Sequence, residues 1–392
     1  MEIRSLVRPS FTEHYVTVIG SSERPAAAAA MFEELAIALV ERGVQVLGEK
    51  IYGAVDHRDE VLAARHSVYA AQRLEPALPC TFVDGKPAEG RGPLAVQLWG
   101  VVPADGTTTS VETVTVGTDR FGRQLVAPGI RLLLVPEITG VDLAGVLPPT
   151  PASQASQMFA NADGALSRQD LSFRDVARTW LYLRRLLDWY GELNDVRTAF
   201  FTERDITGKP PGLPFPASTG IQGTAAGEEC VMDLLAVRLQ DPHGSTRPLN
   251  RSCRQDEPFT YGSAFSRATA LDYEGCQTIW VSGTASIDSA GRSLHHGNPE
   301  AQVLETLLSI AALLEPAGAS LADIASGTFF YKDAESRRVY ERVSTLLGLP
   351  ELPLVPVLAD VCRDELLVEI EAVALVESSP AAPPAAGEQA AP

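Results

Sequence analysis

Residues 172–183 read SFRDVARTWLYL, and 148 residues later, at 320–331, the chain reads SLADIASGTFFY. The two stretches share a serine, an aspartate and an alanine at the same spacing. The helix expected ahead of each stretch also aligns without a gap, with Gln154 on Gln302. Short amphipathic elements can align by chance, but here the order of the elements is preserved as well. We interpret the similarity as an internal repeat.

The repeat continues beyond these two stretches. VMDLLAV (231–237) aligns with LVEIEAV (367–373), which places Asp233 opposite Glu369. Each copy then runs through strand, helix, strand, helix and strand. We predict two copies of one unit, the first of them enlarged by insertions.

Hydrophobic periodicity and turn residues give the other elements. Strands are expected at 14–20, 44–53, 94–102, 130–139, 178–183, 229–239, 265–271, 278–287 and 325–333, with a closing strand pair at 355–362 and 366–376. Helices are expected at 25–43, within 153–177, and at 188–203, 299–317 and 334–348.

The domain boundary is expected in the polar, turn-rich segment 241–262. We therefore assign residues 1–245 to an enlarged N-terminal domain and residues 246–376 to a C-terminal domain. Residues 377–392 are rich in proline and alanine, and this composition is typical of a disordered tail.

The chain is acidic, with a net charge of −18 and a pI near 4.8. This balance argues against a nucleic-acid or membrane-surface partner, because phosphate binding needs clustered basic residues. It leaves open an anionic small-molecule substrate, for which the site must gather its own arginines. Five scattered cysteines without a CxxC pair predict reduced thiols and no metal site. With no signal-peptide pattern and no apolar run of about 18 residues, we expect a cytoplasmic protein.

Near the C-terminus, residues 360–375 read DVCRDELLVEIEAVAL. The run alternates like a half-buried strand but carries Glu369 and Glu371, with Cys362 seven residues ahead of the first. On a strand the two carboxylates share a face, about 6.6 Å apart. Burial and a neighbouring like charge both raise the pKa of a carboxyl group. One of the two is a candidate general acid, and the alternative is a solvated or salt-bridged residue.

The second copy resembles the RidA/YjgF family. Its segments SAFSRATAL, IWVSGTASID, TFFYKD and LLVEIEAVAL match the order of that family's elements over about 110 residues. The first copy carries RTWLYLRRLLDWYGELNDVRTAFF (178–201), and a double chain with this block resembles the chorismatases, which cleave chorismate. The resemblance covers roughly residues 90 to 376. It implies an α+β fold of two RidA/YjgF-like (chorismate mutase-like) units, each a mixed sheet with helices packed on one face.

One departure from the family concerns its imine deaminases, which use an arginine in the loop before the last hairpin. In this sequence the equivalent places hold Ser218 and, in the second copy, a residue near Leu354. Neither copy keeps the arginine, so deamination is not expected.

The resemblance to chorismatases implies a reaction without cofactor or metal on a dicarboxylate with an enol ether. Cleaving that ether requires a proton on the vinyl carbon, and therefore an acid that is still protonated near neutral pH. The family match selects Glu369 for this role and leaves Glu371 as a structural neighbour. The candidates for binding the substrate are Arg267, Arg197, Asn194, Arg178, Tyr190, Lys332, Ser218 and Thr219.

Chorismatases differ in their products, and the branch that forms 3-hydroxybenzoate and pyruvate carries a glycine and a cysteine whose places here hold Gly275 and Cys362. Gly275 would leave room that a methyl group fills, and Cys362 would place a polarizable thiol beside the ring. On the residues alone, Cys362 is a small buried hydrophobic residue. The resemblance thus implies a 3-hydroxybenzoate synthase. The alternatives are hydrolysis to pyruvate and a trans-dihydrodiol, and a non-catalytic module that binds small acids.

The oligomeric state stays open at this point. Proteins of the RidA family are trimers with sites between subunits, whereas a fused pair of units could pack its two copies together and act as a monomer. The expected ligand is the small molecule chorismate in either case.

Overall fold

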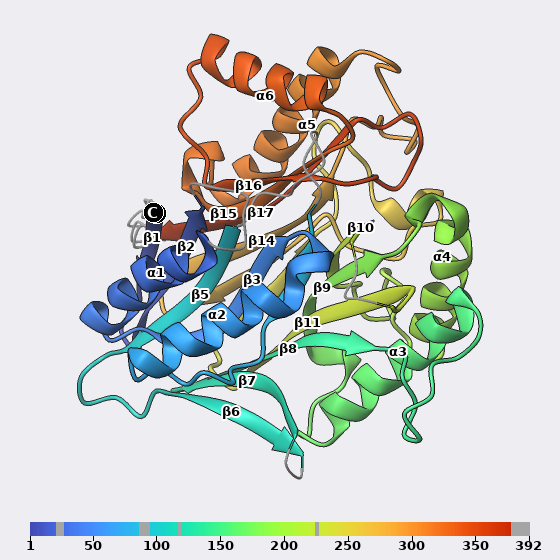
Figure 1. Ribbon diagram of the computed structural model, residues 1–392. Helices are drawn as coiled ribbons and strands as arrows, with labels where there is room; N and C mark the ends of the chain where they lie inside the picture. The colour runs from blue at the N-terminus through green and yellow to red at the C-terminus, as the bar shows by residue number, and fades with distance from the viewer. Residues whose placement is uncertain (21–26, 86–94, 117–118, 224–226, 378–392) are drawn as a thin grey trace, which may run out of the picture.

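The computed structural model describes residues 1–20, 27–85, 95–116, 119–223 and 227–377. Its strands form three sheets, each covered by two helices. Figure 1 shows the sheets meeting at the centre of the molecule, with the helix pairs α1 and α2, α3 and α4, and α5 and α6 on the outside.

The first sheet has the order β1-β2-β5-β3-β4. Its unit comprises β1 (Glu2–Val7), β2 (Phe11–Ile19), α1 (Ala28–Arg42), β3 (Gln45–Gly53), α2 (Arg58–Ala71), β4 (Thr81–Asp84) and β5 (Ala95–Pro103).

The second sheet has the order β10-β9-β11-β8-β7-β6. Its unit comprises β6 (Ser110–Val116), β7 (Asp119–Ala127), β8 (Ile130–Thr139), α3 (Pro151–Ser167), β9 (Val176–Leu183), α4 (Leu186–Thr202), β10 (Ala217–Gln222) and β11 (Cys230–Leu239).

The third sheet has the order β12-β13-β14-β17-β15-β16. Its unit comprises β12 (Ser245–Leu249), β13 (Ala268–Tyr273), β14 (Cys276–Thr284), α5 (Pro299–Leu314), β15 (Ile324–Tyr331), α6 (Ala334–Leu346), β16 (Leu354–Leu358) and β17 (Val368–Glu377).

The three units share one plan. In each, a central strand pairs parallel with an edge strand (β3 with β4, β9 with β10, β15 with β16), and the last strand returns antiparallel beside the central one. The α+β class with mixed sheets and helices on one face is confirmed. The expected number of units is corrected from two to three, because strands β1 to β5 form a sheet of their own and are not an insertion in the second unit.

The 148-residue repeat relates the second unit to the third. Helices α3 and α5 both begin with a proline, Pro151 and Pro299, a residue that suits the first helical position. Ser172 and Ser320 each cap a short 3₁₀ helix that leads into the central strand. The expected closing strand pair is corrected, because β15 lies between β16 and β17 in the sheet. The third sheet begins at Ser245, while the domain boundary itself stays a prediction.

The strand register defines which residues are equivalent among the units. In each unit the pairing of the last strand with the central strand contains one bulge. Counting back along the last strand from that bulge gives three equivalent inward positions: Gln97 in β5, Asp233 in β11 and Glu371 in β17. Glu369 is therefore equivalent to Val231 in the second unit. The alignment of Asp233 with Glu369 was wrong by two residues, because the turn before β11 differs in length from the loop before β17.

The core has two layers. The inner faces of all three sheets pack on each other, and each contributes an indole, namely Trp99, Trp180 and Trp280. Three further apolar clusters lie between each sheet and its own helices. Because the units share their inner core, sites at the seams between them are rigidly held.

Among the described residues, no helix is long and apolar enough to cross a membrane. The cytoplasmic location and the absence of a nucleic-acid partner stay predictions. Most of the expected tail, residues 378–392, lies outside the described residues.

Candidate active site

A pocket opens at the seam between the second and third units. Strand β10 of the second unit and strand β14 of the third run beside each other there. The residues that line it are Tyr190, Arg197, Ser218, Gly220, Tyr261, Ser263, Phe265, Gly283, Ala285, Ile287, Cys362, Arg363, Leu366 and Glu369. Five of the expected site residues are thus brought together: Glu369, Cys362, Arg197, Tyr190 and Ser218.

Glu369 enters the pocket from β17 and is only 4 % exposed. Its carboxyl group lies against Gly283, at the place where the register of β14 and β17 shifts. A Cβ at position 283 would lie 2.9 Å from the carboxyl carbon of Glu369 and would overlap one of its oxygens. The glycine therefore creates the space that the acid occupies. Sequence reasoning missed Gly283, since a glycine within a predicted strand does not reveal what approaches it.

The environment of Glu369 favours the protonated carboxyl. Burial, followed by the negative charge of Glu371, raises the pKa of Glu369 from 4.5 to about 8, while Arg178 acts in the opposite direction. The group is therefore protonated at neutral pH and can donate a proton. This is the behaviour expected of a general acid.

Cys362 lies in the loop between β16 and β17 and faces the pocket. Burial, followed by the nearby Glu369, raises the pKa of its thiol to about 12, so the group stays neutral. Lys332 donates from Nζ to the carbonyl oxygens of Arg363 (3.2 Å) and Asp364 (3.0 Å). Lys332 does not line the pocket, and its contacts instead fix the loop that carries Cys362.

Arg197 supplies a buried cation on helix α4. It is 2 % exposed, and its Nη2 donates to the Oδ1 of Asn194 at 2.6 Å. Its Nε has no hydrogen-bond partner among the described residues. Asn194 does not line the pocket but orients the guanidinium, one helical turn away as the sequence predicted. A buried N–H without a partner at a pocket wall is a ready donor for an anionic ligand.

A second arginine of the pocket, Arg363, was missed by sequence reasoning. Its Nη1 donates to the carbonyl oxygen of Gly291 at 2.5 Å and to the hydroxyl of Ser293 at 3.2 Å. The only signal in the sequence was its position next to Cys362. Two arginines thus line the pocket, Arg197 from the second unit and Arg363 from the third.

Arg267 lies behind the pocket wall. Its Nη2 donates to the hydroxyl of Tyr261 at 2.8 Å and to the carbonyl oxygen of Asp256 at 2.9 Å. Tyr261 lines the pocket and Arg267 does not. The geometry gives Arg267 the task of orienting Tyr261.

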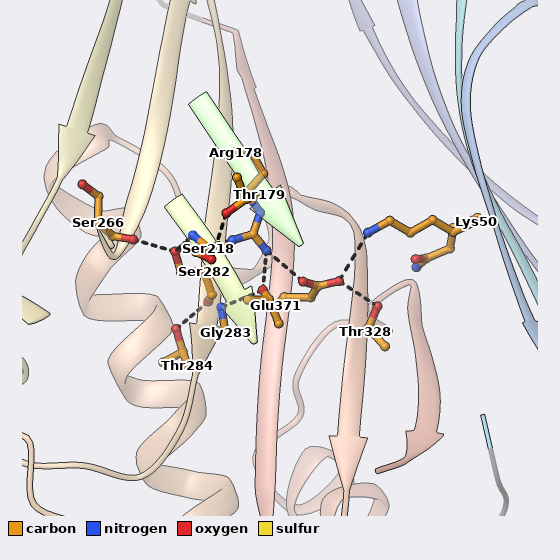
Figure 2. Close-up of polar contacts among 12 residues, drawn as sticks. Lys50, Arg178, Thr179, Ser218, Ser266, Ser282, Gly283, Thr284, Thr328 and Glu371 are labelled. Atoms are coloured by element: carbon orange, nitrogen blue, oxygen red, sulfur yellow. Dashed lines mark hydrogen bonds and ion pairs between the residues drawn. The ribbon is translucent and has the colours of Figure 1, made fainter. Parts of the chain in front are cut away.

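Arg178 and Thr219 also lie behind the pocket. Arg178 is 1 % exposed, and its Nη2 donates to Glu371 Oε2 at 2.8 Å and also to Thr219 Oγ1. Ser218, the neighbour of Thr219 on β10, lines the pocket and accepts a hydrogen bond from Thr179 at 2.9 Å. Figure 2 shows these contacts joining β9, β10, β14 and β17.

The structure does not bring Gly275 to the pocket. It lies in the two-residue turn between β13 and β14 with φ 74°, and an added Cβ would meet no atom within 4 Å. A left-handed φ in a short hairpin turn is the reason for glycine here. The expected role of Gly275 as space beside the substrate is therefore unsupported.

Among the described residues, no group of three or more histidine, cysteine or acidic side chains is arranged to hold a metal ion. The expected absence of a cofactor stays a prediction.

Comparisons with known proteins agree with this architecture. Residues 263–376 match the family model Endoribonuclease L-PSP. A curated chorismatase of Streptomyces rapamycinicus is 28% identical over 221 residues, which are 52% of this chain and 65% of that protein. The match thus spans less than two thirds of the relative's length.

A solved chorismatase structure has the same fold, with a TM-score of 0.59, 18% sequence identity, and coverage of 92% of this chain and 98% of that chain. The Endoribonuclease L-PSP match lies in the third unit, whereas the structural likeness extends over all three. The resemblance of the chain to the RidA-like superfamily, and within it to the chorismatases, is confirmed.

Proposed function

We propose that the protein cleaves the enolpyruvyl ether of chorismate in the pocket between the second and third units, with Glu369 as the general acid. The observation that carries this proposal is a carboxyl group with a pKa of about 8 that faces a pocket lined by two arginines. A dicarboxylate with an acid-labile enol ether is a ligand that such a pocket fits. The relatives named chorismatase support the same assignment.

The first step is proton transfer from Glu369 to the methylene carbon of the enolpyruvyl group. Positive charge then develops on the ether carbon, and the bond from the ring to the ether oxygen is weakened. The ionised Glu369 that results stabilises this charge. A neutral donor in a buried site is needed because an ionised carboxylate has no proton to give.

The two arginines would hold the two carboxylates of the substrate. Arg197 offers its Nε, which has no partner among the described residues, and Arg363 lines the pocket next to Cys362 in the sequence. Because guanidinium binds carboxylate in a fixed plane, two such contacts also fix the ring relative to Glu369. The hydroxyl groups of Tyr190, Tyr261 and Ser218 provide further polar contacts.

For the product we propose 3-hydroxybenzoate and pyruvate. The ring hydroxyl on the carbon next to the one that bears the ether oxygen attacks that ring carbon. The bond from the ring to the ether oxygen breaks, and the protonated enolpyruvyl group leaves as pyruvate. The arene oxide that forms then opens to the phenol. No water is consumed, and the atoms of chorismate are fully divided between the two products. Cys362 supports this branch, since its neutral, polarizable thiol faces the pocket that would hold the ring.

Two other functions remain to be separated by experiment. A hydrolase would add one water and give pyruvate with a trans-dihydrodiol, and a binding module would leave chorismate unchanged. Incubation of the purified chain with chorismate, followed by chromatography, distinguishes all three outcomes. We expect 3-hydroxybenzoate and pyruvate in equal amounts from the wild type and neither from Glu369→Gln. Unchanged chorismate with the wild type would refute the proposed function.

We propose one such site within the part of the chain that the structure describes. At the positions equivalent to Glu369, the second unit has Val231 and the first has Ala95. Neither can supply a proton, so we propose that the other two seams are structural. The three units of one chain then provide what three subunits provide in the RidA trimers, and a monomer is sufficient for activity.

A further inference from the structure

Glu371 lies two residues after Glu369 on β17 but faces a different space. It lines a central cavity that is walled by residues from all three units. Among these are Lys50 from the first unit, Arg178 and Asp233 from the second, and Glu371 from the third. Glu371 is 6 % exposed, so its charge depends on these neighbours.

Each unit contributes one contact to the carboxylate of Glu371. Arg178 of the second unit donates to Oε2 at 2.8 Å, and Thr328 of the third donates to Oε1 at 3.2 Å. The Nζ of Lys50, from the first unit, lies 3.8 Å from Oε1 and 3.9 Å from the ring centre of Trp180. Figure 2 shows Arg178 and Lys50 approaching Glu371 from different sides.

A short chain of contacts leads from Glu371 to the acid. Arg178, which pairs with Glu371, also donates to Thr219 Oγ1. The backbone N–H of Gly283 donates to the same hydroxyl oxygen at 3.0 Å. The carboxyl group of Glu369 lies against Gly283. Glu371 therefore acts on Glu369 from two sides, through its charge and through the segment against which Glu369 packs.

We propose that Glu371 is a positioning residue for the catalytic acid. Through the contact of Lys50 with Glu371, the first unit takes part in this positioning, although it does not line the substrate pocket. The proposal rests on the proposed function of Glu369. The first unit and the central cavity would then contribute to catalysis and not only to the stability of the fold.

The charges around Glu371 predict the sign of the effect. Facing it are Lys50 and Tyr52 from β3, Arg178 and Tyr182 from β9, Asp233 from β11 and Glu369 from its own strand. The charge of Glu371 raises the pKa of Glu369, and Arg178 lowers it. Glu371→Gln removes the first influence and leaves Arg178 without its counter-ion. Both changes lower the pKa of Glu369.

The test is the pH dependence of kcat for Glu371→Gln. We expect the alkaline limb to move to lower pH by about one unit, with kcat falling about 5-fold at pH 8, approaching 10-fold above about pH 9, and changing little at pH 6. A merely structural role would lower kcat by the same factor at every pH. The matched control is Asp233→Asn, because Asp233 occupies the equivalent position in the second unit, is buried in the same cavity and accepts from Thr81 at 2.8 Å. Its alkaline limb should stay where it is in the wild type.

Two further variants keep the proposal testable if Glu371→Gln does not fold. Thr219→Val breaks the chain of contacts without changing any charge, and Thr219→Ser retains the hydroxyl. We expect kcat to fall about 10-fold in the first at unchanged KM, and to stay near the wild-type value in the second. Equal kcat in both variants would overturn the positioning role.

A readout independent of turnover separates this inference from the proposed function. Carbon-13 NMR of the chain with labelled glutamate follows the carboxyl of Glu369, which Glu369→Gln identifies by its missing signal. If the titration midpoint moves down in Glu371→Gln while the wild type leaves chorismate unchanged, Glu371 still controls the protonation of Glu369 and it is the proposed function that fails. An identical midpoint in Glu371→Gln and the wild type would overturn it.

Discussion

Gly283 and Glu369 face each other across the seam of β14 and β17, and the carboxyl group of Glu369 fills the place of the missing side chain. The position of the proton donor thus depends on a residue that carries no functional group. A carboxyl that must reach one carbon atom of the substrate tolerates little displacement.

Gly283→Ala should therefore reduce kcat about 100-fold or more, because the new methyl group overlaps the acid and turns it from the substrate. The control is Gly275→Ala, in the β13–β14 turn. Its φ of 74° predicts a lower Tm, but the open space around it predicts unchanged kcat and product. Steady-state kinetics and thermal melts of both variants check the pair, and normal kcat in Gly283→Ala would contradict the geometry.

The raised pKa of Glu369 predicts that the stability of the fold depends on pH. The folded chain holds the proton up to about pH 8, whereas the unfolded chain releases it near 4.5. Stability contributed by this group is therefore present below about pH 4.5 and is lost as the pH rises toward 8.

Glu369→Gln removes this loss while it abolishes proton transfer. At pH 7 we expect the free energy of unfolding to rise by up to about 3 kcal/mol, with the difference from the wild type vanishing near pH 4.5. Urea unfolding at several pH values measures it. In the wild type, kcat should decline above about pH 8, as the acid ionises. A variant less stable than the wild type at pH 7 would show that the carboxyl is not buried as a neutral group.

Cys362 is expected to influence which product forms. Cys362→Ala keeps a small uncharged side chain but removes the polarizable thiol beside the ring. We expect a larger share of trans-dihydrodiol, with pyruvate still released, because the acid is untouched. Chromatography of the products gives the ratio, and Cys230→Ala, in the apolar core of the second unit, serves as the control for loss of a buried thiol. An unchanged ratio in Cys362→Ala would remove the reason for assigning the 3-hydroxybenzoate branch.

Much of the fold was predictable because similar residues repeat 148 positions apart. The central strands and the helices before them follow the same pattern in the second and third units, down to Pro151 and Pro299. The first unit kept the topology but not the residues. At the position equivalent to Asp233 and Glu371 the first unit has Gln97. Its strands and helices could therefore be predicted from the sequence, but their equivalence to those of the other two units could not.

The site was harder to predict than the fold, because a sequence does not show which space a side chain enters. Arg178 lies on a strand with both faces covered, and it points toward the central cavity and not toward the substrate pocket. Arg267 and Lys332 support the residues or the loop beside the pocket without lining it. Arg363 was missed because a loop arginine has no periodicity from which its direction can be read.

The two pocket arginines allow a test of substrate binding. Arg197→Met and Arg363→Met should each raise KM about 10- to 100-fold, since each removes a charged hydrogen bond to a carboxylate, while kcat changes less because that carboxylate does not react. Arg204→Met is the control, because Arg204 lies in the turn just after the helix that carries Arg197, pairs with Asp163 at 2.8 Å and does not line the pocket. Arg197→Lys should recover only part of the affinity, because an ammonium group cannot reproduce the planar contact. If both methionine variants kept the wild-type KM, the substrate's carboxylates would have to bind elsewhere.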